Sequence, residues 1–141
     1  NSANQALDRI INFFPEERRA QLLMDLSLNL RSLVSQRLIP KQDGKGRVAA
    51  VEIMINSPLI SDLIFKGDVS EVKEIMKKSR QMGMQTFDQA LFDLYESNQI
   101  TFEDALRNAD SLNDLRLQIK LNSQRGKSTD LSAGTENFAI M

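Results

Sequence analysis

Apolar residues recur at helical spacing at the beginning of the chain. Ala3 is followed by Ala6 and Leu7, three and four positions later, and Leu7 by Ile10 and Ile11 at the same intervals, with polar residues between them. This spacing puts the apolar side chains on one side of a helix, so it predicts that the chain opens with an amphipathic helix.

A second helix is predicted to begin at Pro15. Proline suits the first turn of a helix, and the carboxylates of Glu16 and Glu17 favour the positive end of the helix dipole. The leucines that follow form one apolar stripe, which predicts a core-facing helix that reaches about Leu33. These leucines are Leu22, Leu23, Leu26, Leu30 and Leu33.

The pattern then changes to that of a β-hairpin, which we expect over residues 34–55. Val34–Ile39 and Val48–Ile55 are enriched in branched apolar residues, as strands are. The turn between them contains Asp43 followed by Gly44, and then Gly46, which supply the positive φ angles that a tight or bulged hairpin needs.

The second predicted strand has two distinct faces. Successive side chains of a strand point to opposite sides, so Val51, Ile53 and Ile55 share one face. Glu52 points to the other face.

From Ser57 onward the sequence predicts a bundle of short capped helices over residues 57–125. Ser57 and Pro58 form a helix start, and Gly67 and Gly83 lie where helices are expected to stop. In several places a capping oxygen lies three residues before an acid or an amide: Asp68 with Glu71, Thr86 with Gln89, Thr101 with Asp104, and Ser111 with Asp114. The spacing predicts helices near residues 58–65, 69–81, 87–97, 102–109 and 112–124.

The composition narrows the range of functions. A chain of 141 residues can form one domain with a real core, and 18 basic against 19 acidic residues give no electrostatic reason to expect nucleic-acid binding. The absence of cysteine and histidine excludes disulfides, thiol or histidine metal sites, and histidine-based acid–base catalysis. No apolar run approaches the ~18 residues of a membrane span, so a cytoplasmic location is expected. The chain begins with Asn1, which fits either a removed initiator or a piece of a longer protein.

The end of the chain has a different character. Residues 126–141 are small, polar and unpatterned, which predicts a disordered tail.

The sequence contains no recognisable catalytic constellation. The turn Asp43–Arg47 has the glycines and cations of a phosphate-binding loop, but it joins two strands and lacks the helix that such a loop needs. Arg47 remains a candidate for contact with a ligand or a neighbouring domain, although a solvated turn arginine is favoured. We expect no catalytic residue, cofactor site or metal site in this chain.

The predicted helix after Pro58 carries an apolar trio. Ile60, Leu63 and Ile64 are spaced three and four positions apart, so their side chains share one helix face. On a surface such a trio could dock a partner, whereas burial in the core is the commoner outcome. We assign these residues to coupling or packing.

Two stretches carry a resemblance to a known family. SQRLIPKQDGKGRVAAVEIMINSP, from Ser35 to Pro58, closely resembles the hairpin region of the type IV pilus retraction ATPases, the PilT/PilU branch of the secretion-ATPase superfamily. GMQTFDQALFDLYESNQITFEDALRNAD, from Gly83 to Asp110, resembles the helical module that closes such proteins. The resemblance covers the chain from Asn1 to about Leu121.

Within that family the chain looks closer to the PilU type than to the PilT type. FFPEERRAQLLMDLSLNL, at Phe13–Leu30, is one such feature. Another concerns the motif AIRNLIRE, which PilT-type proteins carry after the hairpin and which is important for retraction. The matching stretch here, Leu59–Lys66, keeps the apolar trio but replaces both arginines and the terminal glutamate.

The resemblance implies a mainly α module with one β-hairpin that forms the C-terminal part of a RecA-like α/β ATPase domain, over residues 1–125. Family members are ATP- and Mg-dependent hexameric motors that drive pilus retraction and twitching motility. The resemblance implies a homo-hexamer and, as partners, a PilT-like paralogue and the inner-membrane pilus platform protein, which the motor meets at the cytoplasmic face of the inner membrane. The family's phosphate loop, acidic boxes and histidine box find no match here, so the fragment itself is expected to be inactive.

Other functions stay open from the sequence. A PilT-type or other secretion-ATPase fragment is one alternative, although the absence of paired CxxC motifs argues against the extension and secretion branches. A non-enzymatic helical adaptor is another, and a nucleic-acid-binding module is a distant third.

Overall fold

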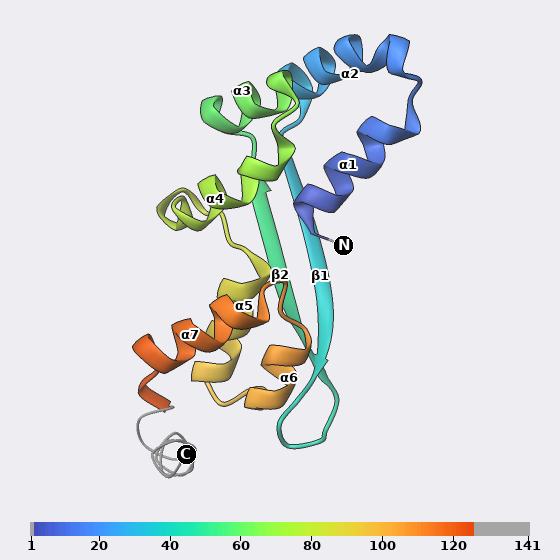
Figure 1. Ribbon diagram of the computed structural model, residues 1–141. Helices are drawn as coiled ribbons and strands as arrows, with labels where there is room; N and C mark the ends of the chain where they lie inside the picture. The colour runs from blue at the N-terminus through green and yellow to red at the C-terminus, as the bar shows by residue number, and fades with distance from the viewer. Residues whose placement is uncertain (1, 126–141) are drawn as a thin grey trace. The chain divides into compact units, whose positions relative to one another are not determined.

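The computed structural model describes residues 2–125 and divides them between two compact units (Figure 1). Unit 1 contains the residues up to Arg37 together with Val51–Phe87, and unit 2 contains Leu38–Ala50 together with the residues from Asp88 onward. The described chain is mainly helical with one two-stranded antiparallel sheet, which confirms the predicted fold class.

The hairpin consists of β1 (Ser32–Pro40) and β2 (Arg47–Ile55). Its register is the same at both ends, where Lys41 N–H donates to Gly46 O at 3.0 Å and Asn56 N–H donates to the oxygen of Arg31 at 2.8 Å. Gly44 and Gly46 have φ angles of 75° and 91°, as predicted for the turn.

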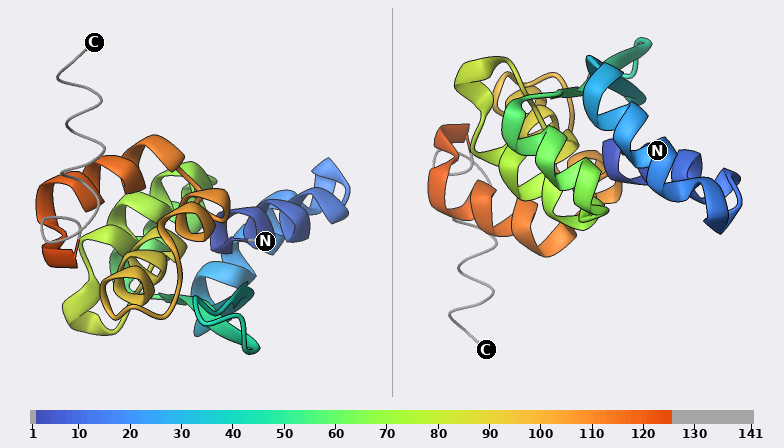
Figure 2. Two further views of the ribbon diagram at one scale, coloured as in Figure 1. Left: turned by 90° about the horizontal axis from the view of Figure 1, so that it is seen from below. Right: turned by 90° about the horizontal axis from the view of Figure 1, so that it is seen from above.

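Four of the α-helices described within residues 2–125 lie in unit 1. They are α1 (Ala3–Phe13), α2 (Glu16–Asn29), α3 (Pro58–Lys66) and α4 (Val72–Lys77), with the short 3-10 turns η1 (Val69–Glu71) and η2 (Arg80–Met82). α2 packs beside α3, as the view from above shows (Figure 2, right). The helix predicted from Ala3 is confirmed, and its start has a full capping box between Ser2 and Gln5.

The predicted end of α2 near Leu33 is wrong, because the helix ends at Asn29 and Leu33 belongs to β1. Leu30 has an extended backbone, with ψ of 130°. The side chain of Asn56 donates to the oxygens of Ser27 and Leu30, at 3.1 and 2.7 Å. A tertiary contact therefore satisfies the last carbonyls of the helix, which the leucine periodicity could not reveal.

The single helix predicted over 69–81 is also wrong, since this segment forms η1, α4 and η2. Asp68 makes no side-chain cap, contrary to the pattern with Glu71. At the other end, the hydroxyl of Ser79 donates to Ile75 O at 2.6 Å, and Ser79 leaves helical geometry with φ of −116°. A serine that bonds back onto the preceding turn competes with continuation of the helix.

Two of the other capping predictions are confirmed, Thr101 with Asp104 and Ser111 with Asp114, because each cap hydroxyl accepts the backbone N–H of the paired residue. The pair of Thr86 with Gln89 stays a prediction. The side chains of Ser57, Thr101 and Ser111 accept backbone N–H groups at the starts of their helices. Gly67 and Gly83 end their helical segments in left-handed geometry, with φ of 78° and 94°.

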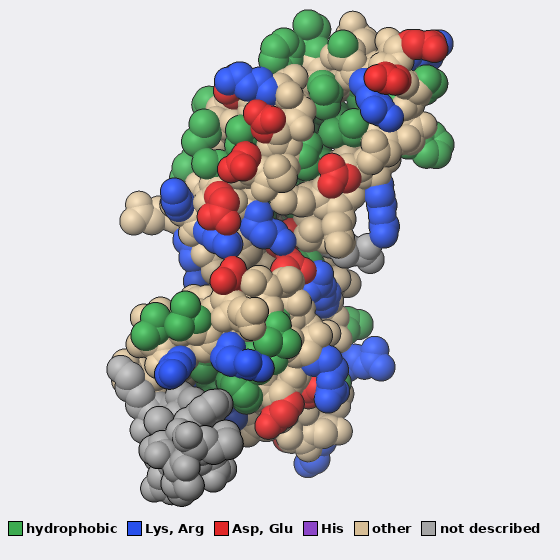
Figure 3. Space-filling view, viewed as in Figure 1, with side chains coloured by type: hydrophobic (Ala, Val, Ile, Leu, Met, Phe, Trp, Pro, Cys, Tyr) green, Lys and Arg blue, Asp and Glu red, His purple; other side chains and the backbone are tan. Residues whose placement is uncertain are grey.

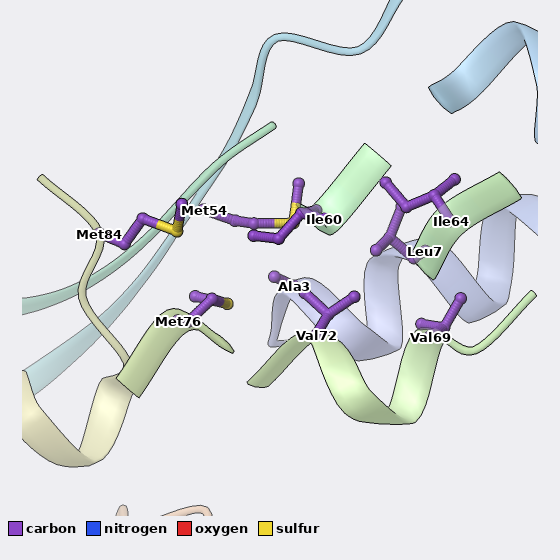
Figure 4. Close-up of a cluster of buried hydrophobic side chains, with 9 residues drawn as sticks. All are labelled: Ala3, Leu7, Met54, Ile60, Ile64, Val69, Val72, Met76 and Met84. Carbon is purple, nitrogen blue, oxygen red and sulfur yellow. The ribbon is translucent and has the colours of Figure 1, made fainter. Parts of the chain in front are cut away.

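The core of unit 1 is a cluster of fully buried side chains from α1, β2, α3, η1, α4 and the segment after η2 (Figure 4). Its members are Ala3, Leu7, Met54, Ile60, Ile64, Val69, Val72, Met76 and Met84.

In unit 2 the main helices are α5 (Phe87–Glu96), whose first residue belongs to unit 1, α6 (Phe102–Arg107) and α7 (Leu112–Asn122). Two carboxylates of α5 hold α7 at its ends. Asp88 accepts N–H groups from Asp110 and Ser111, at 2.8 and 3.1 Å, and Glu96 accepts from the hydroxyl of Ser123. These bonds fix α7 against α5.

Two further predictions concern the ends and the environment of the chain. The predicted tail, residues 126–141, lies outside the described residues. No helix within residues 2–125 is both long enough and apolar enough to cross a membrane.

Candidate functional site: helix α3 and the hairpin

Helix α3 is held by strong local signals at both ends. The hydroxyl of Ser57 accepts Ile60 N–H at 3.3 Å, and Pro58 occupies the first turn, where no backbone N–H is needed. At the other end the N–H of Gly67 bonds to the carbonyls of Leu63 and Ile64. These bonds set the first and last residues of α3.

The apolar trio lies on the inward face of α3. Ile60 and Ile64 are completely buried in the core of unit 1 (Figure 4). Leu63 is partly buried and packs against the same cluster. The structure therefore brings the three predicted residues together by packing. A role for them in coupling remains a hypothesis.

The outward face of α3 carries two residues that sequence reasoning did not select. Leu59 and Phe65 expose 53% and 52% of their surface. Apolar side chains are visible on the surface over α2 and α3, among charged ones (Figure 3). Periodicity could have pointed to Leu59 and Phe65, because both fall outside the buried i, i+3, i+4 set.

An ion pair lies beside these residues. The Lys66 ammonium is 2.8 Å from the Asp62 carboxylate, one helical turn away, and both side chains are solvent-exposed. The hydrogen bond to Asp62 raises the pKa of Lys66 above its usual value. The outward face of α3 thus combines apolar and paired charged groups.

Helix α3 is attached to the end of α2 by hydrogen bonds. The hydroxyl of Ser61 donates to Ser27 O at 2.6 Å, and the Asn56 amide, just before α3, donates to the same oxygen. Because the last carbonyls of a helix lack intrahelical partners, these bonds both satisfy α2 and fix α3 beside it.

Arg47 is exposed at the start of β2, next to the hairpin turn. In that turn Asp43 Oδ1 accepts Lys45 N–H at 2.8 Å, and Gly44 N–H donates to Lys41 O at 3.0 Å. These N–H groups are used inside the turn, and the turn leads into a strand rather than a helix. Neither feature fits a phosphate cradle.

Glu52 is the main residue that sequence reasoning left without a role. It lies on the face opposite Val51 and Ile53, as predicted, and that face is the buried one, with Glu52 itself completely buried. Its Oε1 accepts Ala3 N–H at 2.6 Å and its Oε2 accepts Phe87 N–H at 3.0 Å. A carboxylate in an otherwise apolar strand was the available signal, since a buried carboxylate needs donors nearby.

The described residues form no cluster of side chains that could bind a metal ion. Across residues 2–125 no set of three or more acidic side chains is arranged to hold a metal ion.

Comparison with known proteins places the chain in a family. No family model matches it. It is 56% identical, over 99% of its length, to the type IV pilus ATPase PilU of Pseudomonas aeruginosa, and 40% identical, over 77%, to the PilT retraction ATPase of the same organism. A crystal structure of the pilus retraction motor PilT with bound ADP matches 82% of the chain, with a TM-score of 0.72 and 34% identity.

The chain belongs to the PilT/PilU family of type IV pilus ATPases. It spans only about a third of the length of these relatives, 36% of PilU, 31% of PilT and 32% of the PilT chain in the crystal structure.

Helix α3 contains the residues that the sequence analysis matches to the AIRNLIRE motif of PilT-type proteins. Ser61 stands at the first arginine position and bonds to α2, whereas Phe65 stands at the second and is half exposed. The apolar trio lies in or against the core of unit 1, whereas Ser61 bonds to α2 and Phe65 is exposed.

Proposed function

We propose that the chain is the C-terminal part of a PilU-type motor ATPase that powers type IV pilus retraction and twitching motility. The observation that carries the proposal is the 56% identity to PilU along 99% of the chain. The lower identity to PilT, 40% over 77% of the chain, favours the PilU type over the PilT type.

In this proposal the parent protein binds ATP and Mg²⁺ through residues outside this chain. The hairpin turn does not fit a nucleotide's phosphates, because the N–H groups of Gly44 and Lys45 bond within the turn and a strand, not a helix, follows it. The 141 residues then serve packing, subunit contacts and force transmission.

A feature of the hairpin suggests that β1 and β2 are part of a larger sheet in the parent protein. The sheet within residues 2–125 has only β1 and β2, so the second edge of β1 has no neighbouring strand there. Val34 and Leu38 on β1 expose 66% and 54% of their surface. Since long apolar edge strands are usually covered, we propose that an upstream part of the parent adds to this edge.

The sheet proposal has its own test, in which Val34→Lys is placed in the full-length protein and in the 141-residue chain. The variant is expected to leave the stability of the chain within about 0.5 kcal/mol, as for a surface site, and to destabilise the full-length protein clearly. Equal effects on the thermal melting of both would contradict the idea.

The proposed partners follow from the proposed motor. We propose a homo-hexamer that works with a PilT-like paralogue and with the inner-membrane pilus platform protein, at the cytoplasmic face of the inner membrane.

The decisive experiment uses the full-length gene product. Purified protein should show Mg-dependent ATP turnover, and a strain without the gene should lose or reduce twitching motility, with restoration by the intact gene. A full-length protein without ATP turnover, or a deletion strain with normal motility, would reject the motor function and favour a non-enzymatic adaptor.

A further inference from the structure

Glu52 is a buried acidic group whose position neither catalysis nor ordinary apolar packing explains. It lies in the middle of β2, is completely buried, and accepts hydrogen bonds from two backbone N–H groups far away in the sequence. Burial of a charged side chain is unfavourable unless strong hydrogen bonds replace its hydration.

Both donors are the first residues of helices. Ala3 begins α1 and Phe87 begins α5, and the first N–H groups of a helix have no intrahelical acceptor. Helix N-termini also carry partial positive charge, which favours a carboxylate. Glu52 thus serves two helix starts with one side chain.

The start of α5 is attached to the hairpin by further contacts. Gln85 and Ile53 exchange backbone hydrogen bonds of 2.8 and 2.9 Å, and the Gln85 side chain donates to Val51 O at 2.7 Å. The guanidinium of Arg37, on β1, lies 4.0 Å from the centre of the Phe87 ring. The segment that leads into α5 is therefore fixed to both strands even without Glu52.

The start of α1 is attached differently. Its own residues Ser2 and Gln5 form the capping box, which is local and fixes only the shape of the first turn. The bond from Ala3 N–H to Glu52 is a link across 49 positions of sequence, to the strand beside which α5 begins. It fixes where the first turn of α1 lies.

We propose that Glu52 is a positioning residue that holds the first turn of α1 to the junction of β2 and α5, so that a displacement of the segment entering α1 reaches the start of α5. The proposed link between the starts of α1 and α5 is inferred only from the two hydrogen bonds that Glu52 accepts. The consequence for force transmission rests on the proposed motor function.

The link is tested by amide hydrogen exchange on the full 141-residue chain, read at Ala3, Phe87 and the amides of α1. Glu52→Ala removes both acceptors and is expected to speed exchange at Ala3 and Phe87 by about 5- to 150-fold, the range for leaving a buried backbone donor unsatisfied. The amides of α1 should follow, whereas those later in α5 should change little, because Gln85 and Arg37 still hold its start.

Glu52→Gln keeps the side-chain shape and serves if the alanine variant does not fold. Its amide has one acceptor oxygen for two N–H donors, so Ala3 or Phe87 should lose protection. Glu74→Gln is the matched control, because Glu74 pairs with Lys77 at an exposed position on α4. Unchanged exchange in α1 for the Glu52 variants, or an equal change for Glu74→Gln, would overturn the proposal.

A second measurement addresses the motor and uses Glu52→Gln in the full-length protein. The expected result is a KM for ATP and a turnover within about twofold of the unsubstituted protein, with motility reduced at least tenfold at equal protein level. A parallel loss of turnover and motility would indicate a merely structural role. If the unsubstituted protein itself shows no ATP turnover, the proposed function fails, while the exchange result still decides the link.

Discussion

The side chain of Ile60 is completely buried in the apolar core of unit 1, whereas its neighbour Leu59 in the same helix is 53% exposed. Two adjacent residues of similar size thus have opposite environments, which allows the contribution of burial to be measured within one turn of α3. Successive side chains of an α-helix point about 100° apart around its axis, so Ile60 faces the core while Leu59 faces solvent.

We expect Ile60→Ala to destabilise unit 1 by about 2–5 kcal/mol, because it removes buried methyl groups and leaves a cavity. Leu59→Ala is the control and should change the free energy of unfolding by about 0.5 kcal/mol or less. Urea denaturation followed by circular dichroism measures both. A neutral Ile60→Ala that nevertheless abolishes motility in the parent would show that the apolar trio acts as an interaction face.

Gly67 and Gly83 allow a second comparison at the residue scale. Both have positive φ, so alanine at either position should cost about 1–2 kcal/mol from the backbone alone. A Cβ at Gly67 would lie 3.7 Å from Leu23 Cδ1, an ordinary contact, whereas at Gly83 it would lie 3.3 Å from Ile55 Cδ1. Gly83→Ala should therefore lower the melting temperature more than Gly67→Ala, and the reverse order would contradict the steric argument.

At the scale of the element, α2 and α3 are connected through the carbonyls that end α2. The Asn56 amide reaches two of these carbonyls, and Ser61 reaches one of the same pair. The end of one helix is thus completed by the start of another.

Asn56→Ala should destabilise unit 1 by about 1–3 kcal/mol, since it leaves Leu30 O without its donor and Ser27 O with one donor fewer. Asn29→Ala is the matched control, because the Asn29 amide bonds to Asp25 O within α2 at an exposed position. Chemical denaturation of both variants gives the comparison. Equal small effects would mean that water replaces the Asn56 bonds.

The sequence predicted the local features of the elements well and the tertiary ones poorly. The hairpin turn and the caps at Ser57, Thr101 and Ser111 are confirmed, because glycine φ angles and capping oxygens act over a few residues. The end of α2 was misplaced because the deciding donor, Asn56, lies 26 positions after Leu30.

In the candidate site, too, the local features could be predicted from the sequence and the tertiary contacts could not. The apolar trio could be placed on one face of α3 by its spacing, and the structure adds that this face is buried. Glu52 could be assigned to a strand face by alternation, but its two donors, Ala3 and Phe87, lie 49 and 35 positions away. No pattern within a strand indicates partners at that distance.

At the scale of the whole molecule, the chain passes between the two units at residues 37–38, 50–51 and 87–88. β1 and β2 each contribute residues to both units, and so does α5. The segments that connect the two units along the chain are therefore the two strands of the hairpin and α5.

The 141-residue chain alone should show no ATP turnover above background in a Mg²⁺-containing assay. The reason is that the N–H groups of Gly44 and Lys45 bond inside the turn, and that residues 2–125 contain no acidic cluster arranged to hold a metal. Full-length protein serves as the positive control. Metal-dependent turnover by the pure chain, sensitive to substitution of Arg47, would overturn the assignment of hydrolysis to other parts of the parent.

Glu52 bonds to residues that lie 49 and 35 positions away in the sequence, and this affects the expected order of folding. The hairpin closes a short turn and can form in about 1–10 μs, whereas the Glu52 bonds must close loops of 49 and 35 residues. We expect the strand pair and the locally capped helices to form before the rate-limiting barrier and the Glu52 bonds to form after it. In stopped-flow denaturation, Glu52→Gln should then speed unfolding and leave the folding rate nearly unchanged, whereas an equally slowed folding rate would show that these bonds belong to the nucleus.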